Sequence, residues 1–146
     1  MKQIFKDILT KFNEVPELVW VDKDKGQLDQ YDIRPQVPSH SCLIRFDTTG
    51  IFERGDGKQK RDLRITLRLV FDFMGENYKG QSDEALDQSL AYFDVVEKVE
   101  ATFNLWETAT FNEWAQVGNE EELRQDGLMV TNLYFETSYM YEPEGE

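Results

Sequence analysis

His40 and Cys42 are the side chains of this sequence best suited to nucleophilic chemistry. They lie two residues apart in Ser39-His40-Ser41-Cys42, where a strand is expected to begin, so both would point to one face. A catalytic cysteine needs a histidine as its base and a third group that orients the imidazole, and no such group is evident. His40 is also the only histidine, so a histidine-based metal site would have no further histidine ligands. A structural or surface role is therefore predicted for both residues.

Acidic side chains offer two further candidates, and neither completes a site. Asp22 and Asp24 precede Gly26 as in a calcium-binding loop, but the remaining oxygen ligands and the terminal glutamate of such a loop are missing. Asp47 and Asp72 could approach each other across neighbouring strands, where solvated rim positions are expected for both. The sequence has no phosphate-binding loop, dinucleotide-binding glycine motif or nucleophile elbow. We therefore expect a protein that is not an enzyme and that uses no metal or cofactor.

Length and composition predict a single domain over residues 1–146. Ten Phe, six Tyr and three Trp in 146 residues are enough for one hydrophobic core, whereas two cores would each be small. No apolar run approaches the roughly 18 to 20 residues that span a bilayer, and the N-terminal segment lacks the apolar region of a signal peptide. The single cysteine favours a reducing compartment. These features predict a cytoplasmic protein with no membrane partner.

The net charge of −13 is divided unevenly along the chain. Residues 1–80 contain 14 Lys and Arg against 13 Asp and Glu, whereas residues 81–146 contain 2 against 16. An acidic surface repels phosphate, so no sequence-specific nucleic-acid partner is expected. The first part also includes a basic stretch, which consists of Arg54, Lys58, Lys60, Arg61, Arg64 and Arg68. The acidic region can serve solubility alone, or it can meet the basic stretch of another copy in a head-to-tail contact.

The clearest structural signal is a long hairpin between residues 42 and 73. Apolar and polar residues alternate from Cys42 to Asp47, in a strand that can extend to Phe52. The tip, residues 53–60, contains Arg54-Gly55-Asp56-Gly57, whose glycines tolerate positive φ. One face of the return strand is entirely apolar and consists of Leu63, Ile65, Leu67, Leu69, Phe71 and Phe73. Such a strand reaches roughly 40 Å, more than a small core needs, so the hairpin is expected to project.

The segment before the hairpin predicts one helix and one short strand. Apolar residues at helical spacing indicate a helix over residues 2–14, which Pro16 ends. Residues 17–22 form an apolar run of strand length, residues 23–27 a turn, and residues 28–39 an extended connection that contains two prolines.

The segment after the hairpin predicts a long helix and a final strand. Residues 74–81 form a loop, and Ser82 is the expected N-cap of one long helix that ends near Phe103. Residues 111–117 fit either a short strand or a continuation of the helix, and residues 118–124 an acidic loop. Residues 128–141 form a strand rich in β-branched and aromatic residues, followed by a frayed tail.

These elements predict an α+β fold in the order α-β-β-β-α-β-β. The sheet would be antiparallel, with about four to five strands and a long projecting hairpin. The N-terminal helix and the long helix would pack on one face.

This layout resembles the tail-terminator, tail-completion and head–tail joining proteins of long-tailed bacteriophages. The resemblance begins with the N-terminal helix, followed by Leu18-Val19-Trp20-Val21-Asp22 and Gly26-Gln27-Leu28-Asp29. It continues through the proline-bearing connection into Leu43-Ile44-Arg45-Phe46, the long hairpin, the single long helix and the terminal aromatic strand. It covers nearly the full chain, through patterns rather than catalytic motifs.

The resemblance implies a ring, usually of six subunits, that caps the tail tube or joins it to the head. In such rings the sheets of neighbouring subunits meet, and a long hairpin reaches toward the lumen or the neighbour. The partners would be further copies of the chain and other tail or connector proteins, in the bacterial cytoplasm during assembly and then in the virion. The basic stretch would form the arm, and its acidic acceptors would be Glu97, Glu100, Glu120, Glu121 and Glu122.

Two other functions remain open. Small acidic proteins without active sites also act as immunity proteins or antitoxins, which neutralise a basic partner. A small-ligand binding domain is a third option, although no convergent set of polar residues around an apolar pocket is recognisable. If the charge contact exists, reversing Arg61, Arg64 and Arg68 to Glu should weaken self-association and leave the fold intact.

Overall fold

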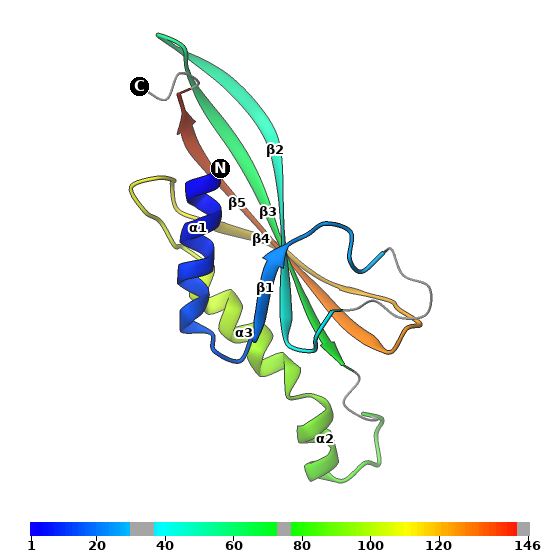
Figure 1. Ribbon diagram of the computed structural model, residues 1–146. Coiled ribbons are helices and arrows are strands. Elements are labelled where there is room, and N and C mark those ends of the chain that lie inside the picture. Colours follow the sequence, from blue (N-terminus) through cyan, green and yellow to red (C-terminus); the bar gives the residue numbers. More distant parts are fainter. Residues whose placement is uncertain (30–36, 73–76, 143–146) are drawn as a thin grey trace.

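The computed structural model describes residues 1–29, 37–72 and 77–142 and has an α+β fold. Its five-stranded sheet has the strand order β1-β2-β3-β5-β4. The strands are β1 (Trp20–Lys23), β2 (Ser41–Gly55), β3 (Lys58–Asp72), β4 (Ala115–Glu122) and β5 (Leu128–Tyr141). The helices are α1 (Lys2–Lys11), the 3₁₀ helix η1 (Phe12–Glu14), α2 (Asp83–Ser89) and α3 (Tyr92–Phe103). In Figure 1 the sheet is strongly twisted, and α1 and α3 lie side by side on one of its faces.

The main core lies between this sheet face and the helices. The predicted apolar face of β3 is buried, since Leu63, Ile65, Leu67, Leu69 and Phe71 have almost no exposed surface; Phe73 lies outside the described residues. The helices cover this face with Ile4 and Ile8 from α1 and with Val96, Val99 and Phe103 from α3. The predicted strand alternation and the predicted helical stripes therefore meet in one core.

Trp114 anchors the chain where it enters β4. Its ring is fully buried and stacks on Phe103 with ring centroids 5.3 Å apart. The ring of Trp106 meets the Trp114 ring edge-on, with centroids 5.0 Å apart. Phe135 of β5 also packs against Trp114, at 5.4 Å. Two backbone hydrogen bonds, from Leu105 N to Trp114 O and from Trp114 N to Trp106 O, hold the segment after α3 against this cluster. The aromatic cluster thus links α3 to both C-terminal strands.

The opposite face of the sheet has a smaller core. It is formed by the buried residues Leu28, Val37, Leu43, Val70, Leu128 and Val130. Leu28 and Val37 come from the described ends of the connection between β1 and β2, and residues 24–29 lie on the side away from α1 and α3 in Figure 1. Beyond this small core the second face carries the charged side chains Arg45, Arg64 and Arg68.

Two sequence expectations about the sheet are wrong, and a third is right only in part. The sheet is mixed rather than antiparallel, because β1 pairs with β2 in parallel, from Trp20 opposite Ser41 to Lys23 opposite Ile44. The predicted acidic loop over 118–124 mostly belongs to β4, which pairs with β5 and contains all three of the consecutive glutamates that suggested a loop. Of residues 111–117, expected to be either a short strand or a continuation of the helix, residues 115–117 begin β4, whereas residues 111–114 join neither a helix nor a strand.

The single long helix is two helices that meet near Leu90. Ser82 caps α2 as predicted, since its side chain accepts a hydrogen bond from Ala85 N at 3.2 Å. At the other end of α2, the hydroxyl of Ser89 donates to Leu86 O, which also accepts from Leu90 N. A serine that shares a helical carbonyl in this way weakens the helix, and the chain changes direction before α3.

The long hairpin is supported along its full length by a third strand. β3 pairs with β2 on one side and with β5 on the other, from Gln59 opposite Tyr141 to Asp72 opposite Leu128. The turn lies at Asp56–Gly57, and Gly55 and Gly57 have φ of 89° and 75°, as the tip prediction requires. The tip extends past the helices in Figure 1. We call this three-stranded extension the arm (residues 49–55, 58–62 and 138–141).

Candidate functional site

His40 and Cys42 do not form a nucleophilic pair. Cys42 is fully buried in the main core, and burial raises the pKa of its thiol far above the ordinary range, so the thiol stays protonated. The His40 ring packs edge-on against Phe71 at 5.2 Å, and Nδ1 lies 3.0 Å from Ser39 Oγ. Across residues 1–29, 37–72 and 77–142, no group of three His, Cys, Asp or Glu side chains could hold a metal ion.

The basic residues of the arm have mixed surroundings. Lys58 lies 3.6 Å from Glu142, and Lys60 lies 3.6 Å from Asp62 and also over the Phe52 ring. Arg61 stacks on Tyr141 with its guanidinium carbon 3.6 Å from the ring centroid. Arg54 is exposed at the tip. The arm is therefore not a purely cationic surface.

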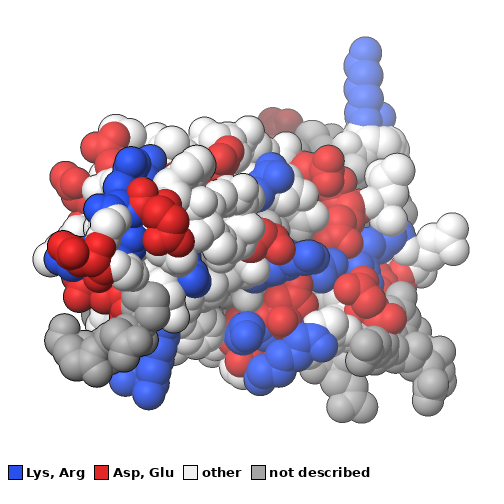
Figure 2. Space-filling model, turned by 90° about the horizontal axis from the view of Figure 1, so that it is seen from above, with Lys and Arg blue, Asp and Glu red and all other residues white. Residues whose placement is uncertain are grey.

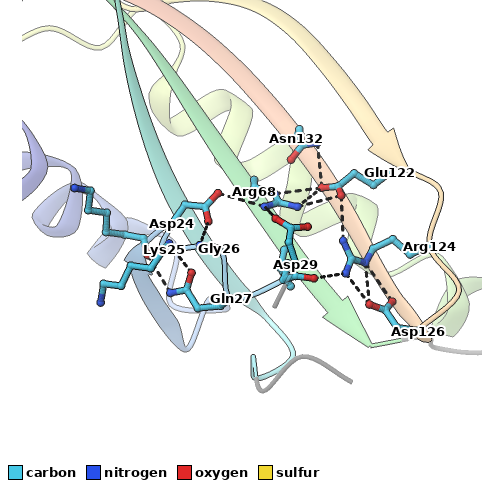
Figure 3. Close-up of polar contacts among 12 residues, drawn as sticks. Asp24, Lys25, Gly26, Gln27, Asp29, Arg68, Glu122, Arg124, Asp126 and Asn132 are labelled. Carbon is cyan, nitrogen blue, oxygen red and sulfur yellow. Dashed lines mark hydrogen bonds and ion pairs between the residues drawn. The ribbon is translucent and has the colours of Figure 1, made fainter. Parts of the chain in front are cut away.

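Arg64 and Arg68 lie further along β3, on the charged face of the sheet. Arg64 stacks on Tyr134 of β5 at 4.6 Å. Arg68 is the centre of an ionic network (Figure 3), in which its guanidinium binds both carboxylate oxygens of Glu122 at 2.8 to 3.2 Å and Asp24 at 3.3 Å. Asp29 lies at 3.5 Å. One predicted basic residue and one predicted acidic acceptor thus bind each other within the chain.

The network extends from Glu122 to Arg124. Arg124 donates to Glu122, to both oxygens of Asp126 and to Leu28 O. Burial lowers the pKa of Arg68, but the hydrogen bonds that its guanidinium donates to Glu122 and Asp24, with the attraction of the two carboxylates, outweigh burial and raise the pKa above its usual value. The pKa of Arg124 is raised mainly by the hydrogen bonds to Asp126. Both guanidinium groups therefore remain charged, and they join the segment after β1 to β3 and β4.

This network changes the expectation for the triple reversal of Arg61, Arg64 and Arg68. The side chain of Arg68 is only 12% exposed and binds three carboxylates, so a glutamate there would place a fourth carboxylate among them. The triple variant is therefore expected to lose stability as well. Arg68 and Glu122 act in folding, and neither is available for a contact with another copy.

The other predicted acidic acceptors divide into two groups. Glu97 is exposed on α3, where Glu100 accepts hydrogen bonds from Gln116 and Asn119. Glu120 and Glu121 are exposed on β4, and they accept hydrogen bonds from Tyr134 Oη at 3.4 Å and Tyr92 Oη at 3.0 Å. The face shown in Figure 2 has Lys and Arg interspersed with Asp and Glu. The charge separation along the sequence is therefore not a separation in space on that face.

Tyr92 gives a pH-dependent prediction. Burial, with the hydrogen bond to Glu121, raises the pKa of Tyr92 to about 12 from an ordinary value of 10.0. Between these values the unfolded chain loses the Tyr92 proton before the folded chain does, so Tyr92 favours unfolding increasingly as the pH rises. Urea unfolding at pH 9 to 11.5 should show stability falling less steeply in Tyr92→Phe than in the parent chain. Equal slopes for the two proteins would contradict the assignment.

The sheet has two free edges that the sequence did not indicate. β1 pairs only with Ser41–Ile44, so in the described part of the chain no strand pairs with the outer side of β2 from Arg45 to Gly55. We call this segment the β2 edge. At the other side of the sheet, β4 pairs only with β5, and its outer side, the β4 edge, is likewise unpaired among the described residues. Unpaired edge strands are ready to accept a further strand.

Apolar side chains are exposed beside the β2 edge. Ile51 and Phe52 are 53% and 47% exposed, and Met140 of β5 is 50% exposed. Phe52 of β2 and Met140 of β5 are both register partners of Lys60 in β3, so the three side chains lie side by side on one face of the arm. Exposed apolar residues that cluster in this way mark protein contacts. Their clustering depends on the register between strands, so it could not be predicted from the order of residues along the chain.

Unpaired strand edges and exposed apolar side chains are features that suit contact with another protein. Among the described residues, no helix is both long and apolar enough to cross a lipid bilayer. The chain matches no model of a known protein family, and it has no significant match among curated proteins.

Proposed function

We propose that this chain is a non-enzymatic structural protein of a long-tailed bacteriophage, a tail-terminator or head–tail joining protein that assembles into a ring of identical subunits. The observation that carries the proposal is the pair of free edges on one sheet, together with the apolar residues exposed on the arm. The ring would form in the bacterial cytoplasm and become part of the virion.

Free edges on opposite sides of a sheet support a ring by geometry. A contact between two different surfaces repeats from copy to copy, and it closes when the rotation between neighbours divides a full turn. The β2 and β4 edges are such a pair of different surfaces, at the two ends of the strand order. The sequence resemblance adds the expected size, six subunits, and the further partners, the tail tube or connector.

Negative-stain electron microscopy of the purified chain tests the proposal. Rings with a central opening and a uniform diameter are expected. Particles of single-chain size at every concentration, also in the presence of tail-tube protein, would contradict it.

A second candidate, an immunity or antitoxin-type protein, is favoured by the outer surface of α2 and α3. Five exposed acidic residues lie on these two helices and have no ion partner in the described part of the chain: Asp83, Glu84, Asp87, Asp94 and Glu97. Phe93 of α3 is exposed as well. Such a surface suits a basic protein partner. A monomeric chain that forms a one-to-one complex with a basic protein, and loses it in Asp94→Lys/Glu97→Lys, would favour this function over the ring.

A further inference from the structure

A cleft of about 640 Å³ lies where the N-terminal end of α1 meets the end of β1 and the first half of β2. Phe5 of α1 and Phe46 of β2 form its apolar wall, with their rings edge-to-face at 6.2 Å. Its volume lies within the range of sites that bind a side chain or a small ligand.

The rim of the cleft is cationic. Lys2, Lys6 and Lys23 line it, are exposed, and form no ion pair within residues 1–29, 37–72 and 77–142. Two aspartates also line the cleft, Asp24 and Asp29, and both face the guanidinium of Arg68. The unmatched charge of the cleft is therefore positive, and it suits an acidic occupant.

The cleft lies at the start of the β2 edge. β1 ends at Lys23, and the hydrogen bond from Asp24 N to Ile44 O is the last on this side of β2. Phe46 faces the helices, whereas the adjacent Arg45 faces the opposite side of the sheet, so the cleft extends around the edge to both faces. An extended strand, whose side chains alternate between two faces, fits this shape better than a compact molecule does.

β4 of another copy has the matching properties. It is itself a free edge, it ends in Glu120-Glu121-Glu122, and the following Leu123 is fully exposed. Three successive antiparallel pairings make β4 antiparallel to β2 within one sheet. A neighbour that continues the sheet would therefore present its β4 antiparallel to the β2 edge, with its acidic end at the cleft.

We propose that the β4 edge of one copy adds to the β2 edge of the next, and that Leu123 of the added strand enters the cleft against Phe5 and Phe46. Glu121 is two residues earlier, hence on the same side, and faces Lys2 and Lys6. Glu120 is on the other side, toward Arg45. The uncharged beginning of β4 then falls beside the exposed Ile51 and Phe52. This inference rests on the proposed function, since it names the contact between neighbours in the ring.

A charge exchange between two variants tests the contact. The cleft variant is Lys2→Glu/Lys6→Glu, and the edge variant is Glu120→Lys/Glu121→Lys. Each alone places like charges at every contact and should weaken assembly by about tenfold or more. Mixed in equal amounts, the two can alternate around a ring, so that every contact again joins opposite charges. The mixture should assemble within about threefold of the parent chain.

Matched controls reverse exposed charges away from both edges. Lys79→Glu and Asp94→Lys/Glu97→Lys should assemble like the parent and should not rescue either test variant. A mixture of cleft and edge variants that assembles no better than each alone overturns the proposed contact, even if the parent forms rings.

A fluorescein-labelled peptide of residues 113–125 separates this inference from the proposed function. Binding of the peptide to the parent chain, with at least tenfold weaker binding to Lys2→Glu/Lys6→Glu, supports the contact even if the chain forms no rings. If the parent is monomeric and does not bind the peptide, both proposals are overturned.

Discussion

Replacing Arg68 with methionine is expected to lower the free energy of unfolding by about 3 kcal/mol, because the change leaves the largely buried Asp24 without its cation and Glu122 with Arg124 alone. The side chains of Arg68, Asp24 and Glu122 are 12%, 9% and 23% exposed, so water can only partly replace the lost contacts. Methionine keeps much of the aliphatic volume of arginine, so the loss reports on the charge rather than on packing. Urea unfolding at neutral pH measures it.

Arg45→Met is the matched control on the neighbouring strand. Arg45 lies 3.2 Å from Asp47, but the two side chains are 63% and 43% exposed. A surface pair of this kind contributes less than about 1 kcal/mol. Equal losses in Arg68→Met and Arg45→Met would contradict the structural role of the network.

The second large effect is expected on the arm. Replacing both Ile51 and Phe52 with lysine should weaken self-association by at least about tenfold, because it would place two charges in the proposed contact with the neighbouring copy and on an edge strand. Both residues are about half exposed in the single chain. The free energy of unfolding should therefore change by less than about 0.5 kcal/mol. Sedimentation velocity measures the association, and urea unfolding measures the stability.

Tyr78→Lys is the control for the arm variant. Tyr78 is 60% exposed and lies outside the arm and both edges. It should leave the association unchanged. If the two arm substitutions leave the association unchanged as well, the arm takes no part in assembly.

Local patterns predicted the hairpin and the helical faces well. The alternation of apolar and polar residues along β3 identified its buried face. Successive side chains of a strand point to opposite faces of the sheet, so in a half-buried strand every second residue faces the core. The N-cap at Ser82 and the glycines of the tip were predictable for a similar reason, since each meets a backbone requirement of its own turn.

Pairings between distant segments were not predictable in this way. β1 is a run of four residues, and nothing in it specifies a parallel partner rather than an antiparallel one. The sequence predicts a loop for residues 118–122 of β4, because consecutive glutamates are poor strand formers. The structure gives the reason they are tolerated: Glu122 binds Arg68 and Arg124, and Glu120 and Glu121 accept hydrogen bonds from tyrosines.

The candidate site was predictable only in part. The basic stretch and the acidic residues were identified by type, but charge along a sequence does not determine which side chains meet in space. The sequence analysis therefore included Arg68 among the residues expected to contact another copy, whereas in the structure Arg68 pairs with Glu122 of its own chain. The free edges became visible only with the strand order, which places β2 beyond Ile44 and β4 at opposite sides of the sheet.

The central claim is that the chain associates with copies of itself in a closed ring. Light scattering behind a sizing column, over a series of protein concentrations at low and high salt, measures the native mass directly. A species near six subunits that dissociates as salt increases is the expected result, because the proposed contact pairs lysines with glutamates. A mass of one chain at every concentration and salt level would contradict the ring and favour a protein that neutralises a basic partner.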